Sequence, residues 1–167
     1  SIEYFNNLHS TINKLNHNDF DSCSSIIANY INKNNKILSC GNGGSASTAS
    51  HYITDWVKMS LTQKKYRLHA ICLSDNIGML TAYGNDINYD SVYSEQVRSY
   101  GNKNDLLICV SGSGNSLNLL QAVDTAKDIG LKSMAIVGYD GGKLIKKCDY
   151  SVHIPSFDMQ ICEDLHL

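Results

Sequence analysis

Two short segments of the sequence combine glycine with hydroxyl side chains in a pattern that suits anion binding. Residues 41–45 read Gly-Asn-Gly-Gly-Ser, and residues 111–116 read Ser-Gly-Ser-Gly-Asn-Ser. Glycine lets backbone N–H groups approach an anion closely, serine adds neutral donors, and a helix N-terminus is electropositive. The second segment therefore predicts a phosphate cradle without lysine or arginine, with Ser111, Ser113 and Ser116 as donors.

The plainer interpretation of such a segment is that it only caps a helix, since serine and glycine are common at helix N-termini. The presence of two similar segments in one chain favours ligand binding over capping. Neither segment is a nucleotide-binding loop. No GK[ST] follows either one, and residues 41–46 lack both the GxGxxG spacing and a clear acidic residue after the next strand.

Two pairs of a histidine and a carboxylate have helical spacing. His51 and Asp55 are four residues apart, and Glu163 and His166 are three apart, so each pair shares one helix face. An imidazole beside a carboxylate can transfer protons or hold a divalent metal. The alternative for either pair is an exposed polar face without a function. Because both pairs follow strand ends, we expect them to face the same rim of the sheet as the serines.

Five expected strands, each followed by a turn or a helix, must position these side chains. The apolar runs predict strands at residues 36–40, 67–73, 105–110, 133–137 and 150–154. Helices are expected at residues 46–59, from about 77 to 83, at 117–128, and briefly after residue 142. This alternation predicts an α/β fold, a three-layer sandwich with a central five-stranded parallel sheet of flavodoxin or Rossmann type. Such sheets bind ligands beyond the carboxyl ends of their strands.

Residues 1–34 carry apolar side chains at helical spacing and predict two helices, broken near residues 16–18. The apolar positions are Ile2, Phe5, Leu8, Ile12, Leu15, Cys23, Ile26, Ile27, Tyr30 and Ile31. Two helices with an apolar face are more than is needed to cover one face of the sheet, so this segment is expected to mediate oligomerisation. With no internal linker, the 167 residues are expected to form a single domain with an α/β core at 35–167.

The composition disfavours several other classes of function. The net charge is −2 and no basic run is present, so nucleic acid is not an expected partner. The apolar runs are too short to span a bilayer, and the polar N-terminus does not read as a signal peptide, so no membrane partner is expected. Six scattered cysteines without a CxxC pair argue against a disulfide framework and indicate a reducing, cytoplasmic location.

Several motifs together resemble the phosphoheptose isomerases, a family with the sugar isomerase (SIS) fold. They are residues 41–46 followed by His51, and then residues 84–86, 96–97, 111–116, 138–142 and 154–156. The resemblance covers nearly the whole chain in the family's order and spacing. It implies an aldose–ketose isomerase that converts sedoheptulose 7-phosphate to D-glycero-D-manno-heptose 7-phosphate through an enediol(ate). The product would enter nucleotide-activated heptose synthesis for bacterial lipopolysaccharide or capsule.

The resemblance also implies the site and the assembly. Phosphate would be held by the three serines of residues 111–116, and the sugar site would be lined by Asn42, Gly43, Ser45, Asp75 and Glu163. His51 and Asp55 would be the catalytic residues. Family members often carry zinc in this pocket, and its expected ligands here are His51, Asp55 and Glu163. The assembly implied is a homotetramer with active sites at subunit interfaces and the N-terminal helices in a central bundle.

Three departures from the family pattern concern the chemistry. Asp55 stands where the family commonly has a glutamate, the expected base, and its side chain is one methylene shorter. Glu163 replaces the family's usual glutamine and makes that end of the pocket more acidic. The family's acid, a histidine, would fall about five residues beyond His166, in an expected C-terminal extension. These departures bear on the sugar and the metal ligands more than on the fold.

Two alternatives to this activity stay open. A SIS-fold protein without a base and an acid could bind a phosphosugar, or serve assembly, without turnover. An isomerase of a different phosphosugar would keep the phosphate cradle and differ at the sugar end. Binding and turnover of sedoheptulose 7-phosphate would distinguish the three.

Overall fold

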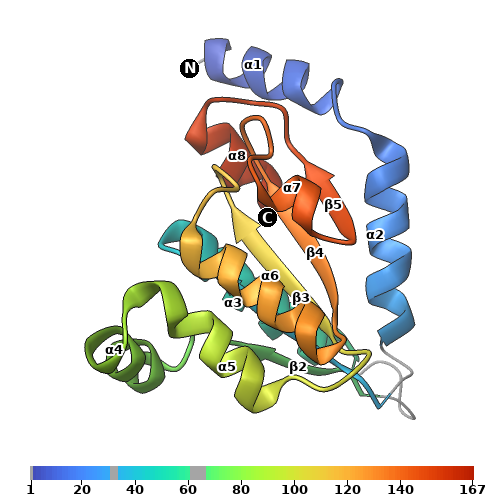
Figure 1. Ribbon diagram of the computed structural model, residues 1–167. Coiled ribbons are helices and arrows are strands. Elements are labelled where there is room, and N and C mark those ends of the chain that lie inside the picture. The colour runs from blue at the N-terminus through green and yellow to red at the C-terminus, as the bar shows by residue number, and fades with distance from the viewer. Residues whose placement is uncertain (1, 31–33, 61–66) are drawn as a thin grey trace.

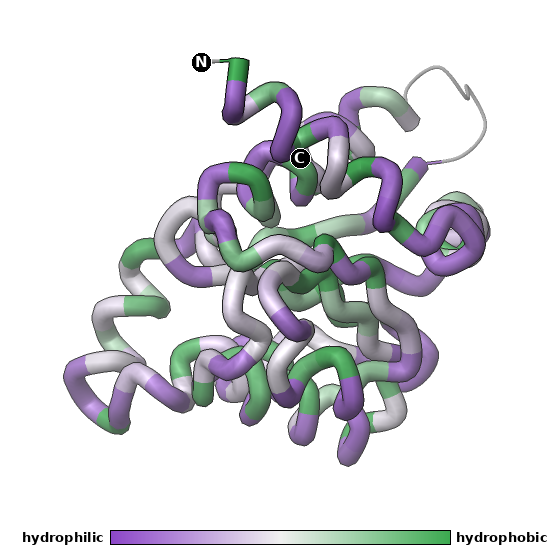
Figure 2. Tube along the Cα trace, turned by 90° about the horizontal axis from the view of Figure 1, so that it is seen from above, coloured by the Kyte–Doolittle hydropathy of each residue, from purple (hydrophilic) through white to green (hydrophobic). Residues whose placement is uncertain are grey.

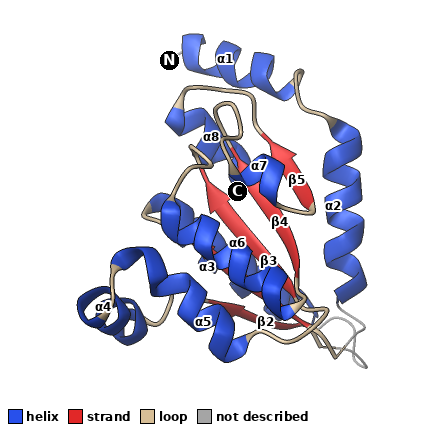
Figure 3. Cartoon of the chain, viewed as in Figure 1, coloured by secondary structure: helices blue, strands red, loops and turns tan. Residues whose placement is uncertain are grey.

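A central parallel sheet with helices on both faces organises the computed structural model, which describes residues 2–30, 34–60 and 67–167 (Figures 1 and 3). The sheet has five strands in the order β2-β1-β3-β4-β5, and every neighbouring pair is parallel. They are β1 (Lys36–Gly41), β2 (His69–Cys72), β3 (Leu106–Ser111), β4 (Lys132–Val137) and β5 (Tyr150–His153). This is the strand order of flavodoxin-like sheets, and the predicted fold class is confirmed.

The middle strands are continuous apolar runs because helices cover both of their faces. All six residues of β3 are buried, and so are five of the six in β1 and in β4. Strands of parallel sheets commonly have this composition. In the register, Gly41 of β1 lies opposite Val110, and Ser111 of β3 lies opposite Val137. The turns after these three strands therefore leave the sheet at one edge, beside one another.

The two faces of the sheet bury separate cores. On one face, α5 (Val92–Tyr100), α6 (Leu117–Ile129) and α7 (Leu144–Lys147) pack over strands β1, β3 and β4. On the other face lie α2 (His17–Tyr30) and α3 (Gly44–Met59), and the side chains of Cys23, Tyr52 and Ile53 contribute to that core. The turns after β1, β3 and β4 are thus each followed by a helix that is anchored in one of the two cores.

The helices confirm most of the sequence-based expectations and add two elements, a 3-10 turn and the helix that follows it. The predicted break separates α1 (Ile2–Ile12) from α2, although Ile31 lies outside the described residues. After β2, α4 (Ile77–Asp86) runs three residues past its expected end, and a 3-10 turn η2 (Tyr89–Ser91) leads into α5. Helix α5 was not predicted. Its buried residues include the polar Ser94 and Gln96, which obscure its apolar periodicity.

Helix α1 leaves most of its apolar side chains exposed. Thr11 is its one buried residue, whereas Ile2, Phe5 and Ile12 are exposed by 81%, 65% and 37%. The Tyr4 hydroxyl donates a hydrogen bond to the carboxylate of Asp164 on α8 (Met159–His166). Figure 2 shows hydrophobic and hydrophilic stretches alternating along this N-terminal helix. In the described parts of the chain, no helix is long and apolar enough to cross a membrane.

Candidate functional site

The turn after β3 presents three serine hydroxyls at the start of α6. Ser111 is 5% exposed, and its Oγ accepts a hydrogen bond from the backbone N–H of Gly114 at 3.0 Å. Ser113 Oγ accepts from the N–H of Asn115 at 3.3 Å, and Ser116 is the N-cap residue of α6 but makes no side-chain capping bond. No described residue accepts the hydroxyl proton of any of the three. Each serine can therefore donate to an anion.

The shape of this turn depends on a glycine in the left-handed region. Gly114 has φ +64°, and a Cβ there would overlap the carbonyl oxygen of Gly141. The carbonyl of Gly114 accepts hydrogen bonds from the N–H groups of Lys143 and Leu144, at 3.1 and 3.0 Å. These two hydrogen bonds tie the turn after β3 to the segment that follows β4.

The turn after β1 is held by hydroxyl groups from two other elements. The hydroxyls of Ser74 and Tyr93 both donate to the carbonyl oxygen of Gly41, the former at 3.1 Å. Gly43, with φ +56°, is the N-cap residue of α3, and Ser45 is buried in the first turn of that helix. These contacts fix the start of α3, and with it the direction in which the helix presents its side chains.

The turn after β1 and the first turn of α6 are joined by the side-chain amides of Asn42 and Asn118. Asn42 Nδ2 donates to Asn118 Oδ1 at 2.9 Å, and Asn118 Nδ2 donates to Asn42 Oδ1 at 2.9 Å. The hydroxyl of Tyr89 donates to the same Asn42 Oδ1 at 3.1 Å. Asn42 was predicted as a site residue, whereas Asn118 and Tyr89 were not. Their nearness depends on the pairing of β1 with β3, for which the sequence carries no local signal.

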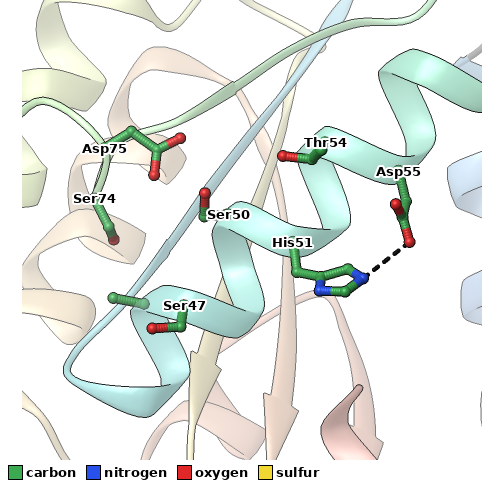
Figure 4. A pocket seen from close by; sticks show the side chains of 8 residues that line it. Ser47, Ser50, His51, Thr54, Asp55, Ser74 and Asp75 are labelled. Carbon is green, nitrogen blue, oxygen red and sulfur yellow. Dashed lines mark hydrogen bonds and ion pairs between the residues drawn. The ribbon is translucent and has the colours of Figure 1, made fainter.

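An open pocket of about 480 Å³ lies along α3, beside the turn after β2 (Figure 4). Across from Asp75, the residues of α3 that line it are Ala46, Ser47, Ser50, His51, Thr54 and Asp55. His51 Nε2 lies 3.0 Å from Asp55 Oδ2, and both side chains are more than half exposed. The structure thus brings His51, Asp55 and Asp75 to one pocket. The serine and threonine positions were missed, although their spacing of three and four residues marks them as one helix face.

The predicted pair on α8 is divided between two environments. The carboxylate of Glu163 packs so closely against Gly44 that a Cβ at that position would overlap it. A carboxylate here is favoured by the positive end of the α3 dipole. His166 is only 3% exposed and lines an apolar groove of about 640 Å³, which His51 and Asp55 also border. The Glu163 side chain therefore contacts the start of α3, whereas the His166 side chain faces the groove.

His166 is buried in the apolar groove. Neither ring nitrogen makes a hydrogen bond of standard geometry to a described residue. Burial lowers the pKa of His166 below its usual value, and the backbone of Val137 raises it to a smaller extent. An imidazole in this position is neutral near pH 7 because charging it would cost desolvation energy.

The three residues expected to bind zinc do not form one ligand cluster in the described parts of the chain. No group of three or more histidine, cysteine, aspartate or glutamate side chains there could hold a metal ion. His51 and Asp55 are hydrogen-bonded to each other, and Glu163 packs against Gly44. The residues present therefore do not fit a three-ligand zinc site within one subunit.

Comparison with known proteins identifies the family. The SIS domain family matches residues 2–138. The phosphoheptose isomerase of Aliarcobacter butzleri is 39% identical over 147 residues, which is 88% of this chain and 77% of that protein. The enzyme of Helicobacter pylori strain P12 is 43% identical over 132 residues, or 79% and 68% of the two chains. The structure of a phosphoheptose isomerase from Neisseria gonorrhoeae superposes with a TM-score of 0.87 at 30% identity, covering 99% of this chain and 89% of that one. The chain belongs to the SIS domain family and, within it, to the phosphoheptose isomerases.

Proposed function

We propose that this protein is an aldose–ketose isomerase that interconverts sedoheptulose 7-phosphate and D-glycero-D-manno-heptose 7-phosphate. One arrangement carries the proposal. The serine turn after β3 and the glycine turn after β1 are joined by Asn42 and Asn118, and the helix that begins in the second turn carries the His51–Asp55 pair. The expected phosphate-binding turn after β3 and the acid–base pair on α3 therefore lie on neighbouring elements. The family of the relatives agrees with this activity.

Phosphate recognition is assigned to the neutral donors of the turn after β3. Ser111, Ser113 and Ser116 each have a hydroxyl proton that no described residue accepts. The first N–H groups of α6 add positive potential at the same place. A hydrogen bond to a charged group contributes about 1.5–3 kcal/mol, so two or three of them anchor a phosphosugar.

Proton transfer between C1 and C2 is assigned to the pair on α3. The Asp55 carboxylate takes a proton from C1 of the ketose while the C2 carbonyl oxygen is protonated, which gives the enediol. After exchange with solvent, the Asp55 carboxyl group delivers a proton to C2 while the O1 hydroxyl loses its proton, which gives the aldehyde. His51 is hydrogen-bonded to this carboxylate at 3.0 Å and lines the same pocket. Its imidazole is assigned to donate the proton to the C2 oxygen and to accept the proton that O1 loses. General acid–base catalysis of this kind contributes about 10²–10⁴-fold in rate. Asn42, Gly43, Ser45, Asp75 and Glu163 are assigned to the sugar end.

The described residues provide no three-ligand site for the zinc ion that the resemblance implies. Two possible ligands, His51 and Asp55, share one helix face, but the described residues do not bring Glu163 into a cluster with them. If a divalent ion binds, it would polarise oxygens of the substrate and stabilise negative charge on them. The steps proposed here use only side chains of this chain.

The assembly and cellular setting follow from the same proposal. The chain would be one SIS domain, with residues 1–34 for oligomerisation and residues 35–167 as the core. The exposed Ile2, Phe5 and Ile12 of α1 support a homotetramer built around the N-terminal helices, with active sites at subunit interfaces. A cytoplasmic enzyme that supplies heptose to lipopolysaccharide or capsule fits this proposal.

Incubation with sedoheptulose 7-phosphate tests the activity. We expect an aldoheptose 7-phosphate to accumulate to equilibrium, as followed by ³¹P and ¹³C nuclear magnetic resonance. Calorimetric binding of the same sugar without turnover would instead identify a binding protein. Turnover of a different phosphosugar at a higher kcat/KM would identify another isomerase.

A further inference from the structure

The orientation of the Asn42 amide is determined by a contact at the far end of the asparagine pair. Asn118 is 2% exposed, and its Oδ1 accepts a hydrogen bond from the backbone N–H of Leu119 at 3.0 Å. A backbone N–H can only donate, so the atom facing it must be the amide oxygen. Asn118 therefore has one permitted orientation.

The two hydrogen bonds between Asn42 and Asn118 then fix the orientation of the Asn42 amide as well. Asn42 Nδ2 must face Asn118 Oδ1, and Asn42 Oδ1 must face Asn118 Nδ2, each at 2.9 Å. Rotating the Asn42 amide by half a turn would set two oxygens and two N–H groups against each other. Because Asn42 Oδ1 is thus an acceptor, Tyr89 must act as the donor in the 3.1 Å bond.

The side-chain amide of Asn42 then has one N–H left that is not hydrogen-bonded to a described residue. Its Oδ1 accepts from both Asn118 and Tyr89, which occupies both lone pairs. One of the two Nδ2 protons is donated to Asn118 Oδ1, and no described residue accepts the other. In the turn after β1, Asn42 can therefore offer a ligand one N–H and no free acceptor.

Tyr89 is itself held by a short, well-connected segment. Asn88 Oδ1 accepts from both the N–H and the hydroxyl of Ser91, each at 2.9 Å, and closes η2. The next helix begins with the buried Val92 and Tyr93, and the hydroxyl of Tyr93 donates to the carbonyl of Gly41. The same segment thus places two phenol hydroxyls on adjacent residues of the turn after β1. Tyr89 is 57% exposed, so its ring contributes little to the core.

We propose that Tyr89 is a positioning residue, which occupies the second lone pair of Asn42 Oδ1 and so keeps the amide in the orientation set by Asn118, with its free N–H donating to an oxygen at the sugar end of the bound phosphosugar. The inference rests on the proposed isomerase function and extends it to a residue that does not touch the substrate. Without the phenol hydroxyl, Asn42 Oδ1 keeps one partner and has a free lone pair. Water or a substrate hydroxyl can then compete for the amide and draw it away from its donating orientation.

The kinetic test is a double-mutant cycle on the intact protein. Tyr89→Phe removes one hydroxyl, and Tyr100→Phe is its matched control, because Tyr100 donates to Met79 Sδ between α5 and α4, away from Asn42. We expect Tyr89→Phe to lower kcat/KM for sedoheptulose 7-phosphate about threefold to tenfold, the loss of one neutral hydrogen bond, with an unchanged unfolding midpoint. Tyr100→Phe should leave kcat/KM unchanged. In an Asn42→Ala background, Tyr89→Phe should have no further effect. An equal effect in both backgrounds would overturn the proposal.

A spectroscopic arm decides the inference even if the sugar is not turned over. In protein labelled with ¹⁵N-asparagine, the Asn42 side-chain resonances are assigned by their loss in Asn42→Ala. We expect one Nδ2 proton to be protected from exchange with water and the other to exchange freely, and Tyr89→Phe to narrow this difference. Unchanged resonances in Tyr89→Phe would contradict the proposal. Failure of the wild-type protein to isomerise any phosphosugar would refute only the function on which it rests.

Discussion

His51 Nε2 and Asp55 Oδ2 lie 3.0 Å apart across one turn of α3, with 54% and 57% of their side chains exposed. An exposed pair at this spacing stabilises a helix by only about 0.3–0.5 kcal/mol. Changes to either residue should therefore alter turnover without altering folding, and the two effects can be measured separately.

Asp55→Asn keeps the shape of the side chain and removes its charge. If the carboxylate is the base, kcat should fall by about 10²–10⁴-fold with little change in KM, and Asp55→Glu should keep measurable activity. Glu95→Gln is a suitable control, because it removes a charge from another helical ion pair, with Arg98 on α5. Full activity of Asp55→Asn would remove Asp55 from the mechanism.

The serine turn predicts a specific loss of phosphate affinity. Ser111→Ala and Ser113→Ala should each raise KM about 10- to 100-fold, since a hydrogen bond to a charged group is worth about 1.5–3 kcal/mol. Competition by inorganic phosphate should weaken in parallel. Ser99→Ala removes an exposed hydroxyl whose one hydrogen bond to a described residue is to the Glu95 carbonyl, and should change neither quantity. Unaltered KM in both turn variants would place the phosphate site elsewhere.

The exposed apolar side of α1 predicts a dependence of assembly on that helix. Phe5→Glu places a charge on the side that carries Ile2 and Ile12, and should dissociate the proposed tetramer in sedimentation velocity. Asn7→Glu adds the same charge on a different side of the helix and should leave the assembly intact. A wild-type protein that sediments as a monomer would refute the oligomer.

His166 predicts a pH dependence of stability. Its pKa is lowered by burial, so below the ordinary histidine value of about 6.5 the unfolded chain binds a proton that the folded chain does not. The free energy of unfolding should therefore decrease as the pH falls below about 6.5, by at most about 1.4 kcal/mol per pH unit from this residue. His166→Leu should remove that part of the slope in urea unfolding at fixed protein concentration. An identical slope in the variant would exclude His166 as its source.

The parts of the site that follow strand ends could be predicted from the sequence. Gly43 and Gly114 adopt positive φ at turns that glycine-rich segments mark, and His51 and Asp55 share a face because of helical spacing alone. These features depend on local backbone geometry, which residue type and spacing determine.

The contacts between turns could not be predicted in the same way. Asn42 and Asn118 are 76 residues apart, and their pairing requires β1 to lie beside β3 in one register. The packing of Glu163 against Gly44 likewise depends on where α8 returns to the sheet. Helix α5 was missed because Gln96 is buried, satisfied by a hydrogen bond to the Val92 carbonyl.

The proposed reaction is proton transfer on a phosphosugar held between the turns after β1 and β3. The most direct measurement is turnover of sedoheptulose 7-phosphate in D₂O, with the product examined by nuclear magnetic resonance and mass spectrometry. Transfer through an enediol with a solvent-exposed carboxylate as base predicts an aldoheptose 7-phosphate that carries deuterium at C2. If the wild-type protein binds the sugar tightly but forms no product and exchanges no deuterium, it is not an isomerase of this sugar.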